Sequence, residues 1–192
     1  MPHINVDETL PGIRALMAFR PETAEPMGML ANILLRDSNS LSMADRELIA
    51  TLVSYMNDCF YCHQSHGAIA CEYLSGDEQL VNQVKLNYET AAISEKLRSL
   101  LAIAASVQKG GKHVTPAQIQ NAKALGASDK DIHDTVLIAA TFCMFNRYVD
   151  GLAANTPTDL SSYPPRARQV VEKGYGNHVF SSHQNPAIQK AL

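Results

Sequence analysis

The sequence predicts an all-α protein, and three observations support this. Apolar residues recur along most of the chain with the spacing of one helix face, N-cap residues precede these runs, and no stretch shows the sustained alternation of a strand. Of the 192 residues, 46% are hydrophobic and 18% are charged, which is typical of a globular chain. Because this length suits one core, we expect a helical domain over residues 1–155 and a proline-containing arm over residues 156–192.

Start and stop signals place four helices in the first half of the chain. Proline disrupts a helix interior, so Pro21 and Pro26 separate the first helix from the second. Ser42 has the chemistry of an N-cap for the third helix, and Asn57 with Asp58 interrupts the pattern and caps a fourth. The predicted ranges are Pro11–Phe19, Met27–Arg36, Ser42–Met56 and about Cys59–Leu74.

Three more helices follow a polar segment at residues 77–87, to which we assign no helix. Ser94, Thr115 and Ser128 begin them as N-caps, and proline follows Thr115 at the first helical position. They run to Gly110, Gly126 and about Ala154.

The arm carries one short predicted helix, Pro165–Lys173, and few apolar anchors. A segment of this kind is either mobile or packed on another surface, and we expect it to lie across a neighbouring subunit. The side chains available for burial there are Val170, Val171, Tyr175, Val179 and Phe180.

Charge and composition exclude several partner classes. There are 16 basic and 19 acidic residues, which give a net charge of −3, and no basic patch that would favour nucleic acid or an anionic membrane. The N-terminus lacks the pattern of a secretory signal, and no apolar run approaches the length of a membrane span. We therefore expect a soluble cytoplasmic protein, in which four cysteines do not form a structural disulfide framework.

The chemistry of the chain centres on Cys59, Cys62 and His66. Their offsets of three and four residues place the three side chains on one helix face. Both cysteines lie at a helix start, where free N–H groups and the helix dipole lower thiol pKa values and favour a thiolate. We interpret Cys71 and Cys143, which lie inside apolar helical runs, as small buried hydrophobes.

Glu47 joins this group only if the chain reverses near Asn57. On one continuous helix, Glu47 would lie about 18 Å from Cys59, too far to interact. In a tight helical hairpin, residues equidistant from the turn face each other, and Glu47 comes opposite His66. A relay from Glu47 through His66 to Cys62 then becomes possible, in which imidazole takes the thiol proton.

Other interpretations of the same residues remain open at this point. Glu47 alone is equally compatible with a solvated position, and His66 alone is more typical of a packing or surface histidine. Cys59, Cys62 and His66 also form a possible set of three zinc ligands. The fourth ligand would then be His63, His113 or His133, because no second cysteine pair occurs.

At these residues the sequence resembles the alkyl hydroperoxidase D (AhpD-like) branch of the carboxymuconolactone decarboxylase superfamily, peroxidase-related type. Glu47, eleven further residues, Cys59-Phe-Tyr-Cys62 and, after three more, His66 follow the active-site pattern of that family. The segments Leu41–Ala50 and Phe145–Leu152 also look like the family. The resemblance covers about residues 25–155.

The resemblance implies an AhpD-like helical bundle that assembles into homotrimers or homohexamers and reduces hydroperoxides. By that analogy Glu47 and His66 form the proton relay, and Cys59 and Cys62 cycle between dithiol, sulfenic acid and disulfide. The reductant would be an external dithiol on a thioredoxin-like or lipoyl protein, since the chain has no flavin or nucleotide fingerprint and no cofactor is expected. We expect Cys62 to attack peroxide and Cys59 to resolve the product, although Cys59 lies closer to the helix N-terminus.

Tyr61 departs from the best-studied members, which carry histidine at that position. Tyrosine does not shuttle protons near pH 7, so we expect Tyr61 to shape the substrate pocket instead. Two alternative functions remain. One is the lactone decarboxylase chemistry of the superfamily, which does not depend on a cysteine pair, and the other is a non-catalytic oligomeric protein that senses redox state or binds zinc.

Overall fold

A computed structural model describes residues 1–175 of the chain, and the regular structure in that range is entirely helical, as the sequence predicts. Within this range no helix combines the length and the apolar character that a membrane crossing requires. The helices, in chain order, are α1 (Ile13–Phe19), α2 (Pro21–Arg36), α3 (Met43–Met56), α4 (Phe60–Tyr73), α5 (Glu78–Asn87), α6 (Glu95–Lys109), η1 (Gly111–His113), α7 (Pro116–Ala124), α8 (Asp129–Gly151), η2 (Leu160–Ser162) and α9 (Tyr163–Lys173).

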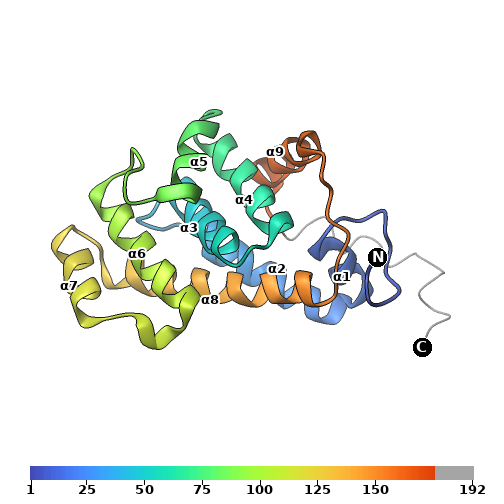
Figure 1. Cartoon of the computed structure of the whole chain (residues 1–192), viewed down its shortest axis with the longest axis horizontal. Coiled ribbons are helices and arrows are strands. Elements are labelled where there is room, and N and C mark those ends of the chain that lie inside the picture. Colours follow the sequence, from blue (N-terminus) through green and yellow to red (C-terminus); the bar gives the residue numbers. More distant parts are fainter. Residues whose placement is uncertain (176–192) are drawn as a thin grey trace.

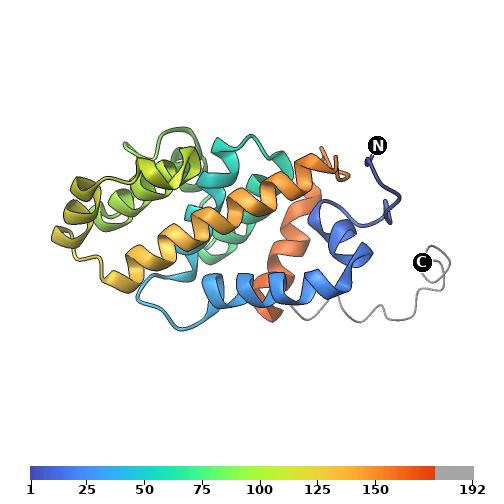
Figure 2. The same cartoon turned by 90° about the horizontal axis from the view of Figure 1, so that it is seen from below.

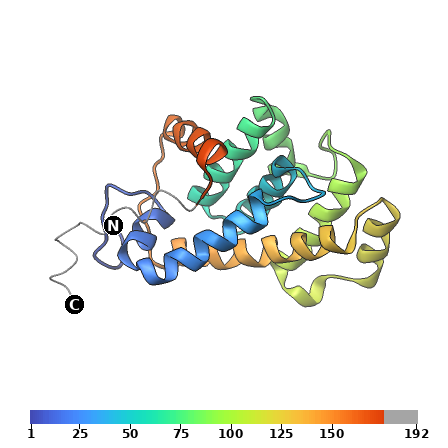
Figure 3. The same cartoon turned by 180° about the vertical axis from the view of Figure 1, so that it is seen from behind.

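Helix α8 runs along most of the molecule, with α6 and α7 at one end and α1 at the other (Figure 1). From behind, α2 crosses the molecule between α8 and α9 (Figure 3). Helix α3 is the central element, because ten of its 14 residues are buried and it packs against α4, α6 and α8. Its apolar side chains meet those of α6 and α8 in the main core, whose largest fully buried members include Leu48, Ile49, Leu52, Leu100, Leu101, Ile103, Ile138 and Phe142.

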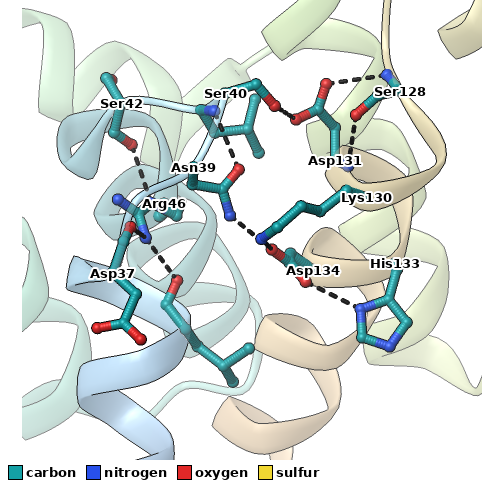
Figure 4. A network of polar contacts seen from close by, with 12 residues as sticks. Asp37, Asn39, Ser40, Ser42, Arg46, Ser128, Lys130, Asp131, His133 and Asp134 are labelled. Atoms are coloured by element: carbon teal, nitrogen blue, oxygen red, sulfur yellow. Dashed lines mark hydrogen bonds and ion pairs between the residues drawn. The ribbon is translucent and has the colours of Figure 1, made fainter.

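A buried polar network fixes the loop between α2 and α3 (Figure 4). The Asp131 carboxylate, at the start of α8, accepts hydrogen bonds from the Ser40 hydroxyl and the Ser128 N–H, and pairs with Lys96 at 2.7 Å. Arg46 donates to the carbonyl groups of Leu34 and Asp37 at 3.1 and 3.0 Å. These bonds tie the end of α2 to α3 and α8, which sets the position of the central helix.

Two predictions about element boundaries were wrong. Helix α2 begins at Pro21 and continues through Pro26, where the missing N–H leaves only the exposed Glu22 carbonyl unpaired, a group that water can solvate. The segment interpreted as merely polar forms α5, which Asp77 caps by accepting from the Leu80 N–H. Only Val81 and Val84 of α5 are buried, so its apolar pattern is too sparse to stand out.

Helices α3 and α4 form the tight hairpin that the functional argument requires. Asn57 ends α3, Asp58 adopts a left-handed conformation with φ of 58°, and Cys59 is the N-cap of α4. Aspartate tolerates this conformation better than most residues, because its short side chain bonds locally. The Asn57 amide is held by Asn146 at 2.8 Å and by Gln108 at 3.0 Å, so α6 and α8 fix the turn. Asn57 and Asp58 therefore form the turn rather than the cap of α4.

The described part of the arm packs on its own chain. Helix α9 packs beside α4 (Figure 1), and the view from below shows it between α8 and α2 (Figure 2). Ala167 and Val170 of α9 form a small apolar cluster with Ile69 of α4. The short helix predicted at Pro165–Lys173 is present and begins two residues earlier. Val179 and Phe180 lie outside the described residues, and contact of the arm with a neighbouring subunit stays a prediction.

Candidate active site

A cavity of about 150 Å³ lies between α1, α2, α4, α8 and α9. Most of its lining is apolar, and the largest apolar contributors are Ile13, Met17, Ile69, Phe142, Phe145 and Val170. Of the predicted site residues, Cys62 and His66 line this cavity. Tyr61 lines it too, as predicted, and its ring lies 6.1 Å from that of Tyr163.

The two cysteines occupy different positions relative to the cavity. Cys62, in the first turn of α4, faces the cavity and is 4% exposed. Cys59, the N-cap residue, is fully buried behind it, and both thiols are free. A substrate in the cavity therefore meets the sulfur of Cys62 before that of Cys59.

The expectation of a lowered pKa is wrong for Cys59. Its hydrogen bond to Cys62 raises the pKa of Cys59, and burial raises it further. The Asp150 carboxylate on α8 is the other acceptor within reach of the single Cys59 S–H, and burial raises the pKa of Asp150 above its usual value. Cys59 is thus a protonated donor that lies between the Cys62 sulfur and a carboxylate.

His66 and Glu47 are in direct contact, as the hairpin argument predicts. His66 Nδ1 lies 2.8 Å from Glu47 Oε2, and the Glu47 side chain has no exposed surface. A carboxylate accepts but does not donate, so the network assigns the proton to Nδ1 and leaves Nε2 as a proton acceptor. The Phe142 ring meets the imidazole edge to face, with centroids 4.5 Å apart, and restricts its rotation.

Tyr175 contacts Glu47 and His66 from the other side. Its hydroxyl donates to Glu47 Oε1 at 2.5 Å and lies 3.2 Å from His66 Nδ1, and its ring stacks on the imidazole. Burial, and next the negative charge of Glu47, raise the pKa of Tyr175 well above its usual value, so the phenol remains a donor. Both carboxylate oxygens of Glu47 are therefore hydrogen-bonded, which is how a buried carboxylate is stabilised.

Arg36 helps to fix the position of Tyr175. Its guanidinium donates to the carbonyl groups of Val170 and Val171, at the C-terminal end of α9, where a positive charge is favourable. The chain then turns at Gly174 with φ of 83°, where a Cβ atom would lie 3.0 Å from the Asn32 side chain. That side chain instead accepts from the Tyr175 N–H at 2.9 Å. Residues of α2 thus hold the tyrosine beside Glu47.

His63, His113 and His133, the possible fourth zinc ligands, do not line the cavity. His63 is buried between Tyr55 and Phe60, and burial lowers the pKa of His63 to about 4. His133 binds Asp134 in the network at the start of α8, far along the chain from α4 (Figure 4). Across residues 1–175, no three His, Cys, Asp or Glu side chains are grouped to hold a metal ion, which leaves the zinc alternative without a ligand set.

Sequence reasoning placed Glu47, Cys62 and His66 together and missed other parts of the site. Tyr175 was noted only as a side chain available for burial, because nothing in the sequence connects it to a residue 128 positions earlier. The cavity also contains Arg14 and Arg166, which no motif indicated.

The fold resembles that of several solved structures. An uncharacterized peroxidase-related protein from Silicibacter sp. TM1040 is 31% identical, with a TM-score of 0.72, and the match covers 80% of this chain and 78% of that one. An alkylhydroperoxidase AhpD core protein, also described as an uncharacterized peroxidase-related protein, from Ralstonia eutropha JMP134 is 27% identical, with a TM-score of 0.72 and coverage of 79% of each chain. A protein of unknown function from Agrobacterium tumefaciens, 21% identical over 83% of this chain and all of that one, shares the fold with a TM-score of 0.67.

The sequence profile of the carboxymuconolactone decarboxylase family matches residues 79–156, which span α5 to α8 and the start of the following loop. None of the curated proteins shows a significant match. The profile match, which begins after Glu47, Cys59, Cys62 and His66, and the 31% identical structure both agree with the family that the sequence resembles. The chain belongs to the AhpD-like branch of the carboxymuconolactone decarboxylase superfamily.

Proposed function

We propose that this protein is a thiol-dependent peroxidase that reduces hydroperoxides through Cys59 and Cys62, with Glu47 and His66 as its proton relay. The observation that carries the proposal is the placement of Cys62 and His66 on one cavity wall, with Cys59 directly behind Cys62. The likeness to peroxidase-related structures supports the same reaction class.

In the first step, His66 Nε2 takes the proton of the Cys62 thiol, and the imidazolium is stabilised by Glu47. The Cys62 thiolate attacks the terminal oxygen of the hydroperoxide, so that an S–O bond forms and the O–O bond breaks. The imidazolium returns its proton to the leaving alkoxide, which departs as an alcohol. Cys62 is oxidised to a sulfenic acid, and the peroxide is reduced.

In the second step, the Cys59 sulfur attacks the Cys62 sulfenic acid. A disulfide forms, and the hydroxyl leaves as water with the proton of the Cys59 thiol. The Asp150 carboxylate, which lies within hydrogen-bond reach of that thiol, is placed to take this proton first.

The cycle needs an external dithiol to reduce the disulfide, and we propose a thioredoxin-like or lipoyl protein for this role. Exchange through a mixed disulfide returns both cysteines to thiols and leaves the donor oxidised. Assembly into homotrimers or homohexamers stays a prediction. Light scattering of the purified protein would measure its oligomeric state.

Mass spectrometry of Cys59→Ser and Cys62→Ser after one equivalent of tert-butyl hydroperoxide tests the proposal. We expect a sulfenic acid, trapped with dimedone, at Cys62 in the Cys59→Ser variant and little oxidation in the Cys62→Ser variant. The wild-type protein should lose two thiols and recover both with a dithiol reductant. Thiols that do not react with peroxide would contradict the proposed function, and a sulfenic acid found only on Cys59 would reverse the two roles.

A further inference from the structure

Two arginines line the active-site cavity. Arg14 reaches it from α1 and Arg166 from α9, and both side chains are half-buried. Burial, and next the charge of Arg14, lower the pKa of Arg166, and both guanidinium charges also act on the Tyr61 phenol. Both cations line the same cavity as Tyr61, the residue that precedes Cys62.

Neither arginine has an acidic partner within residues 1–175. Each ion pair in that range involves other side chains, and the only side-chain hydrogen bond of Arg166 goes to Gln169 at 3.3 Å. The cavity lining includes no Asp or Glu, and the sequence of residues 176–192 contains none either. Two cations that line one small cavity repel each other, so an arrangement without a carboxylate partner favours an anion from outside the chain.

The rest of the cavity is suited to an apolar body. A volume of about 150 Å³ lined by aliphatic and aromatic groups matches the size of cavity that holds benzene in other proteins. Cys62 and His66 lie on the same lining as the arginine pair. A ligand that fills the cavity would thus place one end near the sulfur and its other end near the guanidinium groups.

We propose that Arg14 and Arg166 form a carboxylate-binding subsite, and that the preferred substrates are small anionic hydroperoxides with an apolar body about the size of a benzene ring. Planar guanidinium groups bind carboxylates in a bidentate manner, which fixes the orientation of the ligand. The substrate class rests on the proposed peroxidase function, whereas the subsite itself does not.

The kinetic test compares cumene hydroperoxide with its para-carboxylate analogue, which differ by one negative group. We expect the second-order rate constant for Cys62 oxidation to be about tenfold or more higher for the carboxylate. Arg14→Met and Arg166→Met should each abolish this preference, so that the carboxylate and neutral cumene hydroperoxide react at the same rate within one variant, and methionine preserves the apolar stem of the side chain.

Arg168→Met is the matched control for overall charge. Arg168 lies on the same helix, is exposed, pairs with Glu72 at 3.3 Å and does not line the cavity. It should keep the full preference for the carboxylate. If Arg168→Met lowers the preference as much as Arg166→Met, long-range attraction explains the effect and the subsite is wrong.

A binding experiment separates the subsite from the reaction. We expect calorimetry to detect binding of benzoate but not of benzyl alcohol, and Arg166→Met to weaken benzoate binding about tenfold or more. If benzoate binds but neither peroxide oxidises Cys62, the peroxidase function is contradicted and the subsite is supported. If both peroxides oxidise Cys62 at the same rate and benzoate does not bind, the subsite alone is contradicted.

Discussion

Replacement of Glu47 by glutamine is the sharpest test of the proton relay. The carboxylate accepts from His66 at 2.8 Å and from Tyr175 at 2.5 Å, and neither bond is exposed to bulk water on the Glu47 side. An amide of the same shape keeps the packing but removes the charge. It also offers an N–H₂ group, which can donate to His66 Nδ1 and move the imidazole proton to Nε2. The nitrogen that should accept the Cys62 proton would then carry one.

The expected size of the effect follows from the hydrogen bond between Glu47 and the imidazolium. A hydrogen bond to a charged group contributes about 1.5 to 3 kcal/mol, so we expect removal of the Glu47 charge to cost the imidazolium about 2 to 3 kcal/mol of stabilisation. This corresponds to a decrease of about 30- to 150-fold in the rate of Cys62 oxidation.

The assay is rapid-quench mass spectrometry of Cys62 sulfenic acid in a Cys59→Ser background, because the chain contains no tryptophan for fluorescence. Tyr175→Phe serves as the comparison, since it removes one donor and leaves the carboxylate on His66. We expect a smaller decrease there, about 5- to 15-fold, for one lost hydrogen bond of about 1 to 1.5 kcal/mol. A Glu47→Gln protein that is folded by circular dichroism and reacts within threefold of its parent would refute the relay.

Three further predictions concern stability. Burial depresses the pKa of His63 to about 4, so the folded state should lose stability as the pH falls from about 6.5 to 4. His63→Phe should remove about 3 kcal/mol of this loss, measured by urea titration at each pH. Equal pH dependence of stability in both proteins would contradict this prediction. Burial raises the pKa of Asp131, but its hydrogen bonds lower it to about 2, so Asp131→Asn should cost about 2 kcal/mol at pH 7 and progressively less as the pH falls from about 4 to 2. A pH-independent cost would exclude the charge as its cause. Gly12→Ala places a Cβ atom 2.2 Å from the Tyr61 ring at a φ of 56° and should cost about 1 to 3 kcal/mol, whereas Gly151→Ala, with open space around it, should change stability by less than about 1 kcal/mol in thermal melts.

Much of the fold could be predicted because local chemistry decides it. Ser42 and Ser128 each form a capping box with an aspartate three residues later, a pattern that is visible in the sequence. The hairpin contact between Glu47 and His66 followed from one assumption, the chain reversal at Asn57. Helix α5 was missed because it buries too little apolar surface to show a period, and the extent of α2 was missed because Pro26 lies at a position where its cost is small.

The parts of the site that could not be predicted depend on contacts between distant segments. Tyr175 reaches Glu47 only because Arg36 and Asn32 anchor the end of α9, and none of these positions carries a recognisable motif. The lowered thiol pKa expected at a helix start is not found at Cys59, because complete burial and the neighbouring Cys62 sulfur outweigh the helix dipole. Such effects require the packed structure.

The position of Tyr175 also determines when the catalytic group is complete during protein synthesis. Tyr175 follows His66 by 109 residues, so at the usual rate of translation it is added about 5 to 20 s later. A nascent chain can form the α3–α4 hairpin and bring both cysteines together well before that time. The hydroxyl that donates to Glu47 arrives only with the end of α9, so the hydrogen bonds of Glu47 are complete only after that segment has been synthesised.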